Sequence, residues 1–206
     1  QSYDMIEDTL KYDFEEEKNI DYISMNKEEF NYFIGDGVPK LIERALPEDK
    51  RSEDMIKTLY NEFMVYYRVH FMDKSAPYEN IPQCLNDLLD AGYKLAVVSN
   101  KVDEMTVKIV NKLFDGKFLA VTGKRENYPV KPDPALTLEI MKQLDVNPSE
   151  CVFIGDSGMD IATAKNAGCL SIGVTWGFRL REELQNNNAD YIVTDPNEIL
   201  KVVKGI

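Results

Sequence analysis

Two aspartates one helical turn apart have the most direct chemical implication of any residues in this sequence. Asp156 follows Gly155, which lets the chain turn sharply, and Asp160 lies four residues further on. Two converging carboxylates make a hard oxygen site that suits Mg²⁺, which binds few carboxylates and completes its shell with water and phosphate oxygens. We therefore expect Asp156 and Asp160 to hold Mg²⁺. The alternative is that Asp156 caps a helix and Asp160 is an acid in its first turn.

A lysine in a proline-rich loop is the second group that could do chemistry. Lys131 lies between Pro129 and Pro132, in a loop that ends at Pro134. The prolines keep the lysine backbone extended and exclude it from the following helix. A lysine held in this way can act as a point charge on a phosphate. The alternative is an exposed loop lysine, with Asp133 as the cap of the next helix.

Ser99 and Asn100 form the third group, directly after a short apolar run. A hydroxyl and newly available backbone N–H groups at a strand end, opening toward a helix N-terminus, suit a phosphate oxygen. The pair is therefore a candidate phosphate-binding site. The alternative is that Ser99 is an ordinary helix N-cap.

Each of these groups follows a predicted strand, and the strands alternate with predicted helices. Continuous apolar runs are typical of strands buried on both faces, and strand–helix alternation predicts parallel βαβ units in a doubly wound sheet. Ligands bind such sheets at the carboxyl ends of the strands, where Ser99, Lys131 and Asp156 all fall. The predicted strands span residues 94–98, 118–121, 151–154, 170–174 and 191–193, and the predicted helices span 81–91, 103–113, 133–144, 158–167, 179–186 and 196–203.

The first part of the chain has a different pattern. Residues 1–72 read as helix throughout, with one long amphipathic helix from Asp54 to Phe71. The pattern changes to strand–helix alternation from Pro77. We therefore predict two domains, a helical one over residues 1–76 and an α/β one over residues 77–206.

Composition limits the kinds of partner. Apolar residues make up 44% and charged residues 29% of the 206, which is typical of a globular protein rather than a disordered one. The net charge of −12 argues against a nucleic-acid partner, so any anion site must be local. No apolar run approaches the roughly 20 residues of a membrane helix, and we expect no membrane partner.

The cysteines and the histidine limit the metal and the compartment. Cys84, Cys151 and Cys169 lie in predicted helix or strand contexts and form no Cys-x-x-Cys pair. Their odd number does not support a disulfide framework, and we expect a reducing cytoplasm. With a single histidine, the chain offers zinc very few ligands.

A hydroxyl, a lysine and a paired-aspartate loop after consecutive strands resemble the second, third and fourth motifs of the haloacid dehalogenase superfamily. The resemblance covers nearly the whole chain. Further segments are similar to that superfamily or to its phosphoglycolate phosphatase branch. They are Gly123–Arg125, Ala164, Ala167–Gly168, Thr175–Arg179, Glu182–Leu184 and Ala189–Asp190.

The resemblance implies a fold, a reaction and residue roles. The fold would be a Rossmann-like, doubly wound parallel core with a helical cap domain. The reaction would be phosphoryl transfer to an aspartate and hydrolysis of the aspartyl phosphate, with Mg²⁺ as cofactor. Ser99 and the backbone N–H of Asn100 would bind the phosphate, and Lys131 would bridge the phosphate and the nucleophile. Asp156 would hold Mg²⁺ and Asp160 would support the metal site.

The implied substrate is a small phosphorylated metabolite, with phosphoglycolate in first place. Pyrophosphate, a nucleoside monophosphate and phosphosugar mutase chemistry stay open, as does a non-catalytic binding or regulatory role. In the cap, Gly35 and Gly37 could let a loop approach the site, and Lys40 and Arg44 could contact a substrate carboxylate. The alternative for these residues is a plain helix–helix turn with solvated charges.

The first motif of the superfamily, an apolar strand ending in Asp-x-Asp-Gly-Thr, is not found in residues 1–206. Its first aspartate is the nucleophile. We expect this motif just upstream of Gln1, within about 10–20 further residues that supply one strand and its loop. The 206-residue chain alone is then expected to be inactive and poorly folded. The alternative is a pseudoenzyme whose sheet is closed in another way.

Overall fold

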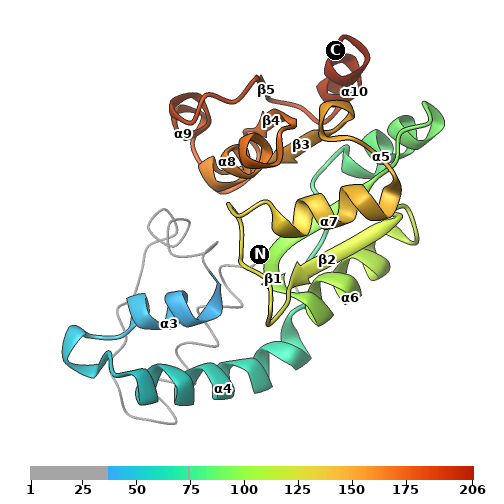
Figure 1. The fold of residues 1–206 in the computed structure, drawn as a ribbon. Helices are drawn as coiled ribbons and strands as arrows, with labels where there is room; N and C mark the ends of the chain where they lie inside the picture. The colour runs from blue at the N-terminus through green and yellow to red at the C-terminus, as the bar shows by residue number, and fades with distance from the viewer. Residues whose placement is uncertain (1–36, 74) are drawn as a thin grey trace. The chain divides into compact units, whose positions relative to one another are not determined.

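The computed structural model describes residues 37–73 and 75–206. The chain divides into two compact units, Gln1–Ala76 and Pro77–Ile206, and each is described by itself (Figure 1). The assignment of the first unit as a cap domain stays a prediction. Within the described residues, no helix has the length and apolar character needed to cross a membrane.

The described part of the first unit is helical, as predicted. It contains α3 (Val38–Ala45), a 3₁₀ turn η2 (Glu48–Lys50) and α4 (Glu53–His70). Helix α4 begins at Ser52, whose side chain accepts a hydrogen bond from the backbone N–H of Met55 at 3.2 Å. Its buried stripe packs against that of α3; the two stripes are Leu59, Phe63, Met64 and Tyr67 on α4, and Leu41, Ile42 and Ala45 on α3. Burying these side chains holds the two helices together.

The second unit alternates strands with helices and confirms the predicted α/β class with a Rossmann-like core. Its elements are α5 (Ile81–Asp90), β1 (Ala96–Val102), α6 (Asp103–Phe114), β2 (Ala120–Lys124), α7 (Ala135–Leu144), η3 (Pro148–Glu150), β3 (Val152–Gly155), α8 (Gly158–Ala167), β4 (Leu170–Val174), α9 (Arg181–Asn186), β5 (Tyr191–Val193) and α10 (Asn197–Lys204). All strand pairs are parallel.

The described strands form two parallel sheets rather than one continuous sheet. One sheet has the order β1-β2 and the other β3-β4-β5, and within the described residues β1 is not paired with β3. Helices α6 and α7 both pack against β1 and β2, and α7 also contacts α8, which covers β3 and β4 (Figure 1). The core of the second sheet is built from α5, β4, β5 and α10, through Cys84, Leu88, Ile172, Val174, Val193 and Ile199.

Strand β1 is longer than predicted, and this changes the place of one candidate group. The sequence predicts a strand over 94–98, whereas β1 runs from Ala96 to Val102. Ser99 and Asn100 therefore lie inside the strand and not after its end. The pairing with β2 is irregular between Val98 and Val102. An irregularity of this kind releases residues from regular pairing and redirects their side chains.

Asp190 ties the start of β5 to β4 and supplies a test of acid stability. Its Oδ2 accepts hydrogen bonds from Ser171 Oγ at 2.6 Å and Ser171 N at 2.8 Å. These bonds, the hydroxyl first, lower the pKa of Asp190 from 3.8. A carboxyl whose pKa is lower in the folded chain stabilises the fold above its unfolded pKa, and this contribution is lost as the pH falls through the folded value.

We expect Asp190→Asn to flatten the loss of unfolding free energy that occurs below about pH 4. The amide cannot gain a proton in that range, so the contribution that the wild-type carboxylate loses is absent from the variant. Urea unfolding at a series of pH values measures the effect. An unchanged pH dependence in the variant would contradict this role of Asp190.

Candidate active site

A buried ion pair joins the predicted lysine to the second predicted aspartate. Lys131 Nζ lies 2.6 Å from Asp160 Oδ1, and the two side chains are 15% and 7% exposed. Lys131 comes from the loop before α7 and Asp160 from the first turn of α8. The ammonium group also lies 5.6 Å from the centre of the Phe153 ring. The alternative of an exposed loop lysine is therefore wrong, because Lys131 is held in place by a buried counter-charge.

The other oxygen of Asp160 is also engaged. Asp160 Oδ2 accepts hydrogen bonds from Ser157 Oγ at 2.6 Å and from Ser157 N at 3.1 Å. Ser157 is the N-cap of α8 and forms a capping box with Asp160. The alternative that Asp156 caps this helix is therefore wrong. With both oxygens in use, Asp160 is suited to orienting Lys131 and the helix start.

Asp156 is the other carboxylate of the pair, and its hydrogen bonds differ from those of Asp160. It follows β3 directly, and its Oδ2 accepts a hydrogen bond from Phe178 N at 2.7 Å. Burial raises the pKa of Asp156, and the Asp160 charge raises it further, while the Phe178 N–H and the Lys131 charge lower it. Desolvation is the largest cause, so the charged form of Asp156 gains from a nearby positive charge.

The donor set fits Mg²⁺ only in part. Within the described residues there is no cluster of three or more His, Cys, Asp or Glu side chains. Asp156 can supply one carboxylate, and Asp160 could act through a bridging water. Mg²⁺ commonly binds through one or two carboxylates, with waters and substrate phosphate completing the octahedron. One carboxylate from Asp156, with Asp160 acting through water, is compatible with this mode of binding.

Two glycines leave the space that the side chains of Asp156 and Asp160 occupy. A Cβ at Gly155 would overlap the Asp160 side chain, and a Cβ at Gly177 would overlap the carboxylate of Asp156. The loop after β4 can thus bring the Phe178 N–H onto Asp156 only because residue 177 has no side chain.

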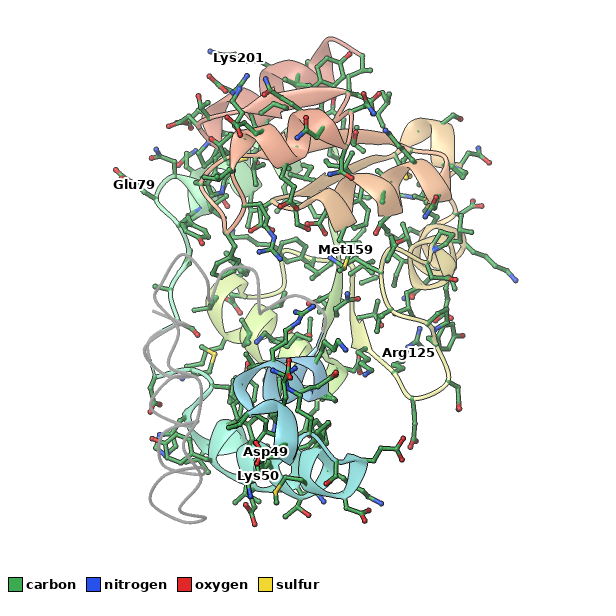
Figure 2. The ribbon with its side chains drawn as sticks, turned by 90° about the vertical axis from the view of Figure 1, so that its left-hand side faces the viewer. Asp49, Lys50, Glu79, Arg125, Met159 and Lys201 are labelled. Carbon is green, nitrogen blue, oxygen red and sulfur yellow. The ribbon has the colours of Figure 1, made fainter. Side chains whose placement is uncertain are left out.

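The side chain of Asn100 fixes the backbone of Lys131. Asn100 Oδ1 accepts a hydrogen bond from Lys131 N at 2.8 Å, and Asn100 Nδ2 donates to Lys131 O at 3.3 Å. The same Nδ2 lies 3.1 Å from Met159 Sδ, and Met159 is labelled at the centre of Figure 2. Asn100 therefore links β1 to the loop of Lys131 and to α8.

For the phosphatase reaction that the resemblance implies, replacing Asn100 by alanine is expected to reduce kcat by about 10- to 100-fold, because small displacements of a charged group have effects of this size. KM should change much less. Asn166→Ala is the matched control, since Asn166 Nδ2 donates to Pro132 O at 2.9 Å, one residue further along the same loop. Wild-type kcat in Asn100→Ala, with thermal stability also unchanged, would exclude this positioning role.

The remaining candidates are placed as follows. Ser99 is next to Asn100 in β1, and its Oγ accepts a hydrogen bond from Lys101 N at 3.1 Å. Gly35 lies outside the described residues. Gly37 precedes α3 with φ 92, a left-handed conformation that favours glycine. Lys40 and Arg44 lie on α3, where Lys40 Nζ is 2.7 Å from Glu43 Oε2.

The sequence interpretation missed three contributors to this geometry. Ser157 had a readable signal, since Ser-x-x-Asp at a helix start is a capping pattern. The side-chain role of Asn100 and the backbone role of Phe178 had none, because each acts on a residue more than twenty positions away, Lys131 and Asp156 respectively.

Comparisons with a family model, with curated proteins and with solved structures all point to the same family. The model of the haloacid dehalogenase-like hydrolase family matches residues 1–174. A phosphoglycolate phosphatase from Vibrio parahaemolyticus is 30% identical over 188 residues, which are 88% of this chain and 82% of that protein. A solved structure from Lactobacillus delbrueckii subsp. bulgaricus, of a protein assigned as a phosphoglycolate phosphatase, has a TM-score of 0.89 at 30% identity. It covers 98% of this chain and 92% of that one.

A more distant solved structure shares the fold alone. The β-phosphoglucomutase of Clostridium difficile has a TM-score of 0.76 at 21% identity, covering 99% of this chain and 88% of that one. The same architecture therefore occurs in proteins whose names give different reactions.

Proposed function

The chain belongs to the haloacid dehalogenase-like hydrolase family, and we propose that it is a Mg²⁺-dependent phosphatase acting on a small phosphorylated metabolite. Phosphoglycolate is the first candidate, supported by relatives of that name at 30% identity. The observation that carries the proposal is the buried Lys131–Asp160 pair beside the partly desolvated Asp156. In an acidic protein, a phosphate site requires local positive charge. The Lys131 ammonium group would supply part of it, and a metal ion held by Asp156 would supply the rest.

The proposal assigns a separate task to each side chain. Lys131 would bind a phosphate oxygen through Nζ while Asp160 and Asn100 keep it in position. Ser99 Oγ and the backbone N–H of Asn100 would donate to the other phosphate oxygens. Asp156 would hold the metal ion. When bound, Mg²⁺ would neutralise charge on the transferring phosphoryl group.

The proposed reaction passes the phosphoryl group to an aspartate and then to water. That aspartate would be the nucleophile of the first motif of the superfamily. The groups described above would bind and neutralise the phosphate before and after the transfer, so their contribution is mainly electrostatic. We further propose a cytoplasmic location, on the cysteine usage given above.

A panel of phosphate esters tests the proposal. We expect the natural protein to release phosphate from phosphoglycolate faster than from nucleoside monophosphates, pyrophosphate or sugar phosphates, and to stop when EDTA removes the metal. A protein that binds Mg²⁺ and inorganic phosphate in calorimetry but hydrolyses no ester would instead support the regulatory alternative. Turnover by the 206-residue chain itself would show that the nucleophile lies within it.

Substitutions on α3 should change the ranking of substrates rather than all rates equally. Lys40 and Arg44 are proposed to contact the part of the substrate that leaves, whereas Lys131 contacts the phosphoryl group that every substrate has. We expect Lys40→Ala or Arg44→Ala to lower kcat/KM for a carboxylate-bearing ester by about 10-fold relative to an uncharged one. Lys57→Ala, an exposed lysine on α4, is the control. A uniform loss across the panel would reverse this assignment.

A further inference from the structure

Two cysteines lie opposite each other at the start of neighbouring parallel strands. Strand β3 pairs with β4 in a constant register, Val152 with Leu170 and Phe153 with Ser171. One step earlier, the same register places Cys151 opposite Cys169. The pairing extends this far, because Leu170 N donates a hydrogen bond to Cys151 O at 3.3 Å.

The spacing of a parallel sheet suits a covalent bond at this point. Neighbouring strands lie about 4.8 Å apart, within the range of Cα separations of about 4.4–6.8 Å that disulfides span. Both side chains belong to one apolar cluster with Met141 and Ala167. Burial, and after it the neighbouring Cys151 thiol, raises the pKa of Cys169 to about 11.

The two thiols differ in access. Cys169 is 8% exposed, whereas Cys151 is half-buried. Cys151 Sγ donates to Asn147 O at 3.2 Å, in the turn at the surface before β3. The third cysteine, Cys84, is 3% exposed and belongs to a different cluster, on α5. Cys151 and Cys169 are therefore the only two of the three cysteines that share a cluster, and Cys151 is the one that solvent reaches.

We propose that Cys151 and Cys169 are a thiol pair that forms an intramolecular disulfide when the protein meets a small-molecule disulfide. The Cys151 thiolate attacks one sulfur of the oxidant and releases one small-molecule thiolate. The Cys169 thiolate then attacks Cys151 Sγ and releases the second. The protein is oxidised by two electrons, the small disulfide is reduced to two thiols, and each cysteine loses one proton.

This bond would enclose the segment that carries the candidate active site. Residues 152–168 contain β3, Asp156 and all of α8 with Ser157 and Asp160. The bond itself lies at the amino-terminal ends of the strands, away from Asp156 at the carboxyl end of β3. Oxidation is therefore expected to raise Tm by several degrees, because a cross-link restricts the unfolded chain. It leaves the aspartates in place.

Incubation of the folded natural protein with oxidised glutathione, followed by intact mass and peptide mapping, tests the proposal. We expect a loss of two hydrogen masses and a linked peptide containing Cys151 and Cys169. Because the thiolate is the reacting form, the rate should rise about tenfold per pH unit below the thiol pKa. Cys84→Ser should react as the wild type does, whereas Cys151→Ser and Cys169→Ser should form no internal bond.

Three results would overturn the proposal. The first is a stable glutathione adduct on Cys151 without the internal bond, and the second is a linked peptide that includes Cys84. The third is that the folded wild-type protein stays reduced under conditions in which the urea-unfolded protein forms disulfides. All three are read on the wild-type chain, so the test does not depend on whether the serine variants fold.

Discussion

Asp156→Asn is expected to lower Mg²⁺-dependent phosphate release by the natural protein by more than about 100-fold. Losing a residue that only orients a metal ligand costs up to about 100-fold, and Asp156 is proposed to be a ligand itself. The amide keeps the shape of the carboxylate and an oxygen for the Phe178 N–H. It removes the negative charge and is a weaker ligand for a hard cation. Steady-state phosphate release over a Mg²⁺ titration measures the effect, which should be largest at low Mg²⁺.

The matched control for this change is Asp190→Asn. Asp190 is hydrogen-bonded to Ser171, at the amino-terminal end of β4, and is not part of the proposed site. Its neutralisation should leave turnover at neutral pH unchanged. Wild-type turnover of Asp156→Asn at limiting Mg²⁺ would show that Asp156 is not a metal ligand. Calorimetric titration of both variants with Mg²⁺ separates a loss of binding from a loss of chemistry.

Lys131→Met should reduce turnover of every phosphate ester by a similar factor, of about 1000-fold, the scale measured when a preorganised charge-stabilising group is removed. Lys131 is proposed to touch the phosphoryl group, which all of these substrates share. The variant should also lose stability, by about 3 kcal/mol, because Asp160 would be left buried without its counter-charge. Turnover across the ester panel and urea unfolding measure the two effects.

A double variant separates the two effects of removing Lys131. In Lys131→Met with Asp160→Asn, the uncompensated buried charge is gone, so most of the stability should return while turnover stays low. Lys94→Met is the control, since Lys94 Nζ donates to Leu144 O at 2.7 Å at the end of α7, outside the site. Recovery of turnover together with stability would mean that Lys131 acts only through folding.

Local signals in the sequence were sufficient for most of the secondary structure of the second unit. Helix α8 was predicted over 158–167 and is observed there, because Ser157 caps its start and Gly168, with φ 78, ends it. Strands β4 and β5 were predicted with their observed bounds. Each of these signals lies within a few residues of the element that it bounds. The bounds of these elements can therefore be predicted from the sequence without knowledge of the tertiary structure.

The candidate site could be predicted as a set of residues but not as an arrangement. Strand–helix alternation placed Lys131 and Asp156 at one edge of the fold, since parallel strands all point the same way. It did not predict that Asp160 would be fully engaged by Lys131 and Ser157, or that Asn100 would hold the backbone of Lys131.

Those features were decided by tertiary structure. Strand β1 continues past Ser99 and Asn100 to Val102, where its pairing with β2 resumes at Lys124. The N–H on Asp156 comes from Phe178, 22 residues later in the chain. Hydrogen bonds between distant segments form only when packing brings the segments together. Local propensity and periodicity contain no information on which partner a polar side chain will meet, and burial then decides how strongly the two must pair.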